Sequence, residues 1–177
     1  MFSLLALSPL AASDLYPSRI PDDERDTAQR AAKLVSKQRY DDAANLYRVI
    51  IQEHPDSLYG WFNLGVVRVR QGEYAAGRTA FLHALTLAPN DEMCLADLGI
   101  VESDTGHAED AVKYLLAALK LLPNDPTTHE YLSQAYEQLG RHGDAQAEEA
   151  KAAELRKGQG MFQLQDFEPD DKTRHSS

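Results

Sequence analysis

Apolar residues recur along this chain at two spacings, one nested in the other. Locally they follow one face of a helix, as Tyr74, Phe81 and Ala84 do. On a longer scale the whole pattern returns at a fixed period of about 34 residues. Pro55 and Pro89 mark one period, and Pro123 follows one period later. Because a fixed period of this length indicates stacked supersecondary units, the pattern predicts a repeat protein.

Two central units carry the repeat most clearly. The second unit contains Trp61, Leu64, Gly65, Gly72, Tyr74, Phe81, Ala84 and Pro89. One period later, the corresponding residues of the third unit are Leu95, Leu98, Gly99, Gly106, Ala108, Leu115, Ala118 and Pro123. The flanking units match at fewer positions. Agreement at so many positions predicts the same local fold for each unit.

Glycines and acidic residues predict where the helices end and begin. Gly72, Gly106 and Gly140 divide each unit into two helices of about 14 residues, at the position where a helix C-cap favours glycine. Asp91 and Asp125 precede the following helices and are predicted N-caps. Each unit is therefore expected to be a helix-turn-helix.

The residues resemble the tetratricopeptide repeat family, whose consensus is W-x2-L-G-x2-Y followed by small, aromatic, small and proline positions. The resemblance covers residues 24–159. It implies an all-α fold, a right-handed α-solenoid of about four 34-residue helix-turn-helix units with degenerate end units. The predicted units are 24–57, 58–91, 92–125 and 126–159.

The end units depart from this pattern. Thr27 and Arg30 replace large apolar residues in the first unit, and His129 and Glu149 do so in the last. These substitutions predict polar outer faces, which keep the ends of a solenoid soluble. Ile50 occupies a position that is small in the other units, so looser packing is expected there.

Two segments lie outside the repeats. Residues 1–23 begin with an apolar stretch that ends in small residues but lacks a basic start, which leaves two interpretations. One is a signal peptide, which would place the protein in the periplasm or outside the cell. The other is a cytoplasmic protein whose apolar segment docks on its own surface. The glycines around residue 158 predict the end of the last helix, and residues 160–177 form a polar tail.

Composition narrows the classes of partner. The chain has 177 residues and a formal net charge of −10. A basic face is needed to neutralise phosphates, so nucleic-acid binding is not expected.

No apolar run reaches the ~18–20 residues that span a bilayer. The single cysteine, Cys94, excludes an intramolecular disulfide.

No enzymatic chemistry is indicated by the sequence. The six histidines are spread over the repeats without a metal-ligand spacing, and no phosphate-binding loop or nucleophile motif occurs. Cys94 stands between apolar residues and is expected to be a small buried hydrophobe. We therefore predict no catalytic residue, no metal and no cofactor.

The resemblance implies that the first helices of the units line a concave groove. Carried over position by position, the predicted groove residues are Tyr59, Phe62, Asn63, Val66, Val69, Arg70, Met93, Ala96, Asp97, Ile100, Asp104, Glu130, Tyr131 and Gln134. The apolar members predict an exposed strip that binds a partner. Alternatively, the N-terminal segment or a loop covers that strip.

The charges suggest the kind of ligand. Acidic groove residues gather toward the later units, which favours a peptide with apolar anchors and some basic character. Only Asn63 matches the Lys-Asn-Arg clamp with which some relatives grip a C-terminal carboxylate, so that mode is not expected.

The predicted function is a non-enzymatic protein–protein interaction module that binds a peptide or partner protein. The alternative is a secretion or complex-assembly chaperone, similar to the chaperones of type III translocators or an envelope assembly factor. The end units of separate copies could stack on one another, so the sequence leaves open whether the protein forms a homo-oligomer.

Overall fold

The structure, a computed structural model, describes residues 20–165, with side chains through residue 158. Over that range the chain forms eight α-helices and no strand. The helices are α2 (Arg25–Ser36), α3 (Tyr40–Glu53), α4 (Leu58–Arg70), α5 (Tyr74–Leu87), α6 (Glu92–Asp104), α7 (Ala108–Leu121), α8 (Pro126–Gln138) and α9 (His142–Gln165). Each predicted unit thus contains two helices. Most of the predicted leader and tail lies outside the described residues.

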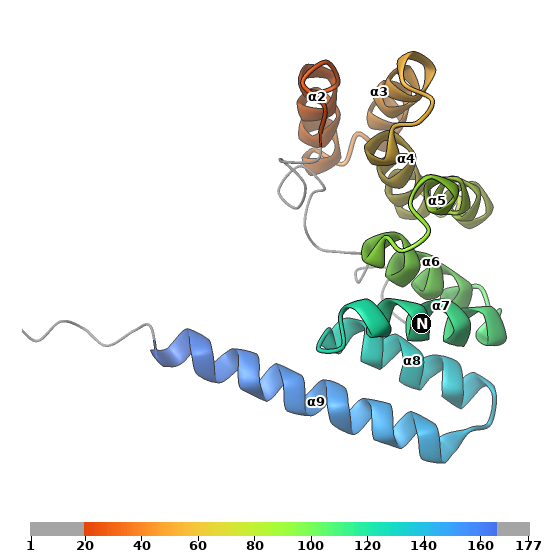
Figure 1. The fold of residues 1–177 in the computed structure, drawn as a ribbon, viewed down its shortest axis with the longest axis vertical. Helices are drawn as coiled ribbons and strands as arrows, with labels where there is room; N and C mark the ends of the chain where they lie inside the picture. Colours follow the sequence, from red (N-terminus) through yellow and green to blue (C-terminus); the bar gives the residue numbers. More distant parts are fainter. Residues whose placement is uncertain (1–19, 166–177) are drawn as a thin grey trace, which may run out of the picture.

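The helices pack in chain order to form a curved stack (Figure 1). Every helix contacts the next one, within a unit and between units. The first helices of consecutive units also touch, because α4 contacts α6 and α6 contacts α8. This arrangement confirms the all-α solenoid, and it places α4, α6 and α8 along one side of the molecule.

The turn inside each unit has the same backbone geometry. Gly72, Gly106 and Gly140 have φ angles of 80°, 82° and 70°, in the left-handed region that favours glycine. The residue after each glycine donates its N–H to the carbonyl five residues earlier, as Glu73 does to Arg68 at 2.9 Å. The predicted C-caps are confirmed at these three positions.

Short polar side chains start the later first helices. The carboxylate of Asp91 accepts the N–H of Cys94 at 3.0 Å, and that of Asp125 accepts the N–H of Thr128 at 2.8 Å. Both N-caps agree with the sequence prediction. Ser57 does the same for α4, accepting the N–H of Gly60 at 3.0 Å. These bonds satisfy backbone donors that a helix start leaves free.

The two helices of a central unit meet through a glycine and a large side chain. A Cβ placed on Gly65 would lie 2.7 Å from the ring of Phe81. A Cβ on Gly99 would lie 2.6 Å from Cγ of Leu115 and 3.1 Å from its backbone nitrogen. Both large side chains have no exposed surface. The small positions of the repeat are therefore the points where the helix backbones approach most closely.

The last helix is longer than the sequence predicted. We expected it to end at the glycines around residue 158, but α9 continues to Gln165. A Cβ on Gly158 would have nothing within 4 Å, and this residue does not adopt the left-handed backbone of the turn glycines. A glycine inside a helix costs about 1 kcal/mol relative to alanine, which weakens a helix without ending it.

Two other expectations about side chains were wrong. His129 does not give the last unit a polar outer face; it is buried between α8 and α9. Its Nδ1 lies 2.5 Å from a Glu148 carboxylate oxygen, and its Nε2 lies 3.1 Å from the Pro123 carbonyl. Ile50 is also tightly packed, because Gly60 on α4 leaves room for it: a Cβ there would lie 3.1 Å from Ile50.

We predict that Gly99→Ala destabilises the protein by about 1–3 kcal/mol, because the added methyl group overlaps Leu115 and its backbone. Urea denaturation followed by circular dichroism measures the change. The control is Gly143→Ala in α9, where nothing lies within 4 Å of the added carbon. That variant should be neutral or more stable by up to about 1 kcal/mol. Equal stability losses in both variants would contradict the close helix contact.

Candidate functional site

Seven of the predicted groove residues keep solvent-accessible side chains on α4, α6 and α8. We call this set the first-helix face: Arg70, Met93, Ala96, Asp104, Glu130, Tyr131 and Gln134. The three helices contact one another in series, so the seven residues share one side of the stack. This face joins residues that are up to 64 positions apart in the sequence (70 to 134).

The other seven predicted residues are buried. They are Tyr59, Phe62, Asn63, Val66, Val69, Asp97 and Ile100. Phe62 packs on Phe81 of α5, with ring centroids 5.7 Å apart. Val69 faces α5 as well, since a Cβ on Gly77 would overlap its methyl group. The expected exposed apolar strip is therefore absent from the described surface.

Buried polar members of this set bond within the fold. The Asn63 amide donates to the carbonyl of Tyr59 at 2.9 Å, one turn earlier in α4. Tyr59 packs edge-on against Tyr47 of α3, with centroids 6.0 Å apart. Burial raises the pKa of Tyr59 to about 12. Asn63 and Tyr59 thus stabilise α4 and its contact with the first unit.

Negative charges from α6 and α8 gather around Tyr131. Its pKa is raised to about 12, first by burial and then by the charges of Asp104, Glu130 and Asp97. These acids come from two units, so their convergence on one phenol shows that the stacking brings them together. Burial also raises the pKa of Asp104, although its side chain keeps contact with solvent. This end of the first-helix face is acidic.

One of these acids is already paired. A carboxylate oxygen of Glu130 lies 2.6 Å from a guanidinium nitrogen of Arg156 on α9. The sequence analysis missed Arg156, because it lies on a second helix and the repeat consensus assigns no groove position there. The two residues are also too far apart in the sequence for a contact within one helix, so no local signal could have found the pair. Asp104 has no such ion pair with another described residue, so it is the more available acid.

Two buried polar atoms near this face have no hydrogen-bond partner among the described residues. They are Nε of Arg70 and the hydroxyl of Ser103. The backbone around Ser103 is held in place, since its carbonyl accepts a hydrogen bond of 3.0 Å from Gln138 of α8. A buried polar atom without a partner costs free energy, so these two atoms lower the stability of the fold.

The residues that carry reactive groups in other proteins are dispersed or buried in the described part of the chain. No group of three or more His, Cys, Asp or Glu residues there is placed to hold a metal ion. Cys94 is buried, and burial raises the pKa of its thiol. A thiol in that state is a poor nucleophile. His129 pairs with Glu148, and His142 pairs with Glu137 at 2.7 Å, so the two histidines do not share a site.

Comparison with known families agrees with the repeat geometry. The model of the tetratricopeptide repeat family matches residues 28–92 and 96–160, which together are more than half of the chain. The chain belongs to the tetratricopeptide repeat family. Members of this family are in general non-enzymatic scaffolds that bind proteins or peptides. None of the described helices is long and apolar enough to cross a membrane.

Solved structures of MamA proteins have a similar fold. MamA from Desulfovibrio magneticus RS-1 is 18% identical, with a TM-score of 0.72 over 76% of each chain. MamA AMB-1 is 25% identical, with a TM-score of 0.66 over 72% of this chain and 76% of the other. Among curated proteins, Protein FlbA of Caulobacter vibrioides is 26% identical over 167 residues. The match covers 81% of this chain but only 28% of the length of that relative.

Asp104 offers a test of the electrostatics at this face. Its raised pKa means that the folded protein holds this proton more tightly than the unfolded chain does, so the ionised carboxylate destabilises the fold at neutral pH. We expect Asp104→Asn to raise the free energy of unfolding at pH 7, by less than about 1 kcal/mol because the carboxylate is partly hydrated.

This gain should vanish near pH 3, where the wild-type carboxyl group is protonated in both states. Urea denaturation at the two pH values measures it. Glu149→Gln, which changes an exposed acid on α9, is the control and should have little effect at either pH. A gain from Asp104→Asn that is the same at pH 3 and pH 7 would contradict the assignment.

Proposed function

We propose that this protein is a non-enzymatic interaction module that binds a segment of a partner protein along the first-helix face. The observation that carries the proposal is the side-by-side placement of α4, α6 and α8, which gives one continuous surface with contributions from three units. Membership in a family of protein-binding scaffolds supports it.

The charge of this face favours a ligand with basic side chains. Asp104 is accessible and is destabilised by partial burial, so an incoming Lys or Arg would stabilise its ionised form. Tyr131 stands beside it with a half-buried ring, which offers a surface for a cation or an alkyl chain. These two neighbours suit the side chain of a lysine or an arginine.

Apolar and neutral positions on the same face suit the rest of the ligand. Met93 and Ala96 on α6 are partly exposed, and a flexible thioether adapts to different apolar side chains. Gln134 on α8 can donate and accept hydrogen bonds with an extended backbone. The ligand we propose is therefore a peptide that combines basic and apolar residues.

Selection of peptides from a random display library tests this function. We expect wild-type protein to enrich peptides that contain Lys or Arg beside apolar residues. Asp104→Lys combined with Gln134→Lys should weaken the selected peptides at least tenfold, about 1.4 kcal/mol, because the cation then faces a positive surface. Fluorescence anisotropy with labelled peptides measures the affinity.

The matched control is Glu109→Lys combined with Glu149→Lys. It adds four positive charges, against three in the test variant, at exposed positions on the second helices α7 and α9, so it is the more demanding control for general charge effects. Control and wild type should bind with nearly equal affinity. The proposal fails if the library yields no saturable binder, or if both double variants lose affinity to the same extent.

A further inference from the structure

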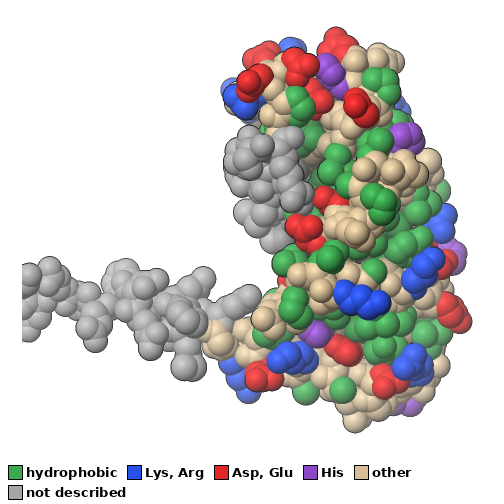
Figure 2. Space-filling model, viewed as in Figure 1, with side chains coloured by type: hydrophobic (Ala, Val, Ile, Leu, Met, Phe, Trp, Pro, Cys, Tyr) green, Lys and Arg blue, Asp and Glu red, His purple; other side chains and the backbone are tan. Residues whose placement is uncertain are grey.

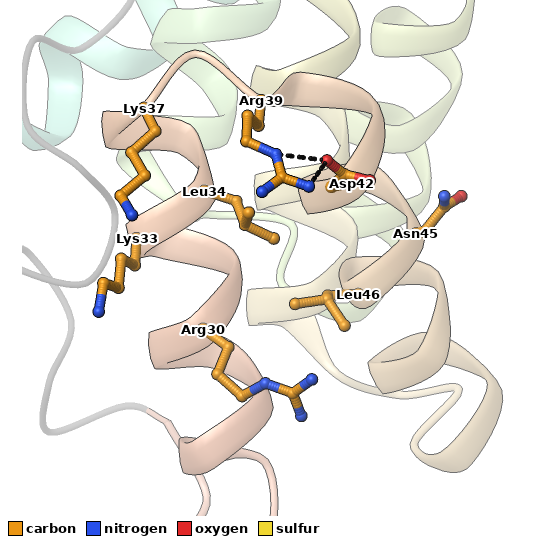
Figure 3. Close-up of a pocket in the computed structure, with 8 residues that line it drawn as sticks. All are labelled: Arg30, Lys33, Leu34, Lys37, Arg39, Asp42, Asn45 and Leu46. Atoms are coloured by element: carbon orange, nitrogen blue, oxygen red, sulfur yellow. Dashed lines mark hydrogen bonds and ion pairs between the residues drawn. The ribbon is translucent and has the colours of Figure 1, made fainter.

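A basic cleft lies between α2 and α3, on a different part of the molecule from the first-helix face. Its volume is about 470 Å³. It is lined by Arg30, Lys33, Leu34, Lys37, Arg39, Asp42, Asn45 and Leu46. Figure 3 shows the side chains of Leu34 and Leu46 between the two helices, with basic residues on both sides of them. The cleft therefore has an apolar floor and a positively charged rim.

Most of this positive charge is not neutralised. Arg39 forms an ion pair with Asp42, with its Nε 2.7 Å from the carboxylate. Arg30, Lys33 and Lys37 have exposed side chains that form no ion pair or hydrogen bond with any described residue. Three cations without a partner among the described residues therefore lie around one cleft, in a chain with a net charge of −10. Figure 2 shows both acidic and basic side chains at the α2 end of the molecule, so the positive charge is confined to the cleft.

We call the contact between one unit and the next a joint. Comparison of the repeats shows that this cleft lies at an open joint, where no preceding unit packs in the described stack. Leu34 corresponds, one, two and three periods later, to Arg68, Glu102 and Tyr136. Those three residues are buried, with 8%, 0% and 7% of their surface exposed, whereas Leu34 is only partly buried. In each later unit this position lies on the first helix. The second helix of the preceding unit packs against that first helix. Within the described stack no helix precedes α2, so the same position stays open.

The closed joints include polar contacts between units. Arg78 of α5 donates to the carboxylate of Glu102 on α6 at 2.5 Å. Asp41 of α3 accepts a hydrogen bond from Gln71, at the end of α4, at 2.7 Å. We expect a segment that docks in the open joint to form polar contacts of the same kind, between a carboxylate and a basic or amide side chain. Since the free side chains here are basic, it must bring carboxylates and one apolar group.

The chain itself contains such a segment directly after α9. Residues 166–171 are Asp-Phe-Glu-Pro-Asp-Asp, four carboxylates around one phenylalanine. We propose that this segment of a second copy of the protein docks in the basic cleft. The carboxylates meet Arg30, Lys33 and Lys37, and Phe167 covers Leu34 and Leu46. This surface and its ligand are independent of the partner peptide proposed above.

Geometry favours a second copy over the same molecule. The segment follows α9, whereas α2 lies at the other end of the stack (Figure 1). Six helices, α3 to α8, separate them, and neighbouring helix axes are roughly 8–10 Å apart. Six extended residues span at most about 20 Å. Each copy offers one cleft and one acidic segment, so the contact is head-to-tail and builds linear assemblies.

Binding of a synthetic peptide of residues 160–177 tests the proposal. The receptor is the full chain carrying Asp170→Lys and Asp171→Lys, so that its own segment does not compete. We expect saturable binding by fluorescence anisotropy, weakened several-fold when NaCl is raised from about 50 to 500 mM. Adding Lys33→Glu and Lys37→Glu to the receptor should weaken binding at least tenfold, and Phe167→Ala in the peptide should also weaken it.

The control receptor carries Lys113→Glu and Lys120→Glu, two exposed lysines on α7, and should bind as the parent does. Circular dichroism verifies that all receptors are folded. No saturable binding to the parent receptor would overturn the proposal. Equal losses in the cleft and control variants would overturn it too, because they would indicate general charge attraction only.

Sedimentation velocity of the full chain gives a second readout. Wild-type protein should self-associate as its concentration rises. Either Lys33→Glu with Lys37→Glu, or Asp170→Lys with Asp171→Lys, should abolish association. Mixing the two variants should restore it, because the unchanged acidic segment of the first variant fits the unchanged cleft of the second. A wild-type monomer at all concentrations, or association that both variants retain, would overturn the proposal.

Discussion

Gly65 lies against the ring of Phe81, and Gly99 lies against Leu115. These contacts set how closely the two helices of a unit approach, and therefore the angle at which the next unit is added. Because protein interiors are densely packed, an extra carbon at either glycine has no free space to occupy. The same pairing recurs in the next unit, and contacts between the units then place α4, α6 and α8 side by side. The binding surface that we propose exists only as a consequence of this spacing.

Charge is distributed along the stack according to whether a joint is closed or open. Inside the stack, charged side chains are buried with partners: Glu102 has no exposed surface and pairs with Arg78 and His107. An unpaired charge at such a depth would cost several kcal/mol, so these partners hold the units in register. At the α2 end, where no described helix covers the first unit, the lysines and Arg30 keep their hydration and remain available. The net charge of −10 conceals the positive charge of the cleft lining, which has four basic residues and one acid.

The first-helix face and the basic cleft are different kinds of surface. The face is assembled from three units and is acidic around Tyr131, whereas most apolar residues of the predicted groove are turned into the core. The cleft belongs to one unit and is basic, and its two leucines stay partly exposed. A repeat protein can hold two such surfaces without conflict, because each unit interacts mainly with its neighbours. The two can therefore bind ligands of opposite charge.

The sequence by itself determined two helices in each unit, their order, the three turn glycines and the two capping aspartates, but not the end of the last helix. Turn glycines, capping aspartates and the repeat period act locally, so they can be recognised without knowing the fold. It also determined which positions are small and which are large. Only the tertiary structure decided which groove residues are exposed: Phe62 and Val69 follow the groove pattern, yet they pack on α5. The period says nothing of the rotation of each helix, which is set by the volumes of the side chains that meet between helices. For the same reason the burial of His129 and the pairing of Glu130 with Arg156 depend on contacts between helices that the sequence does not specify.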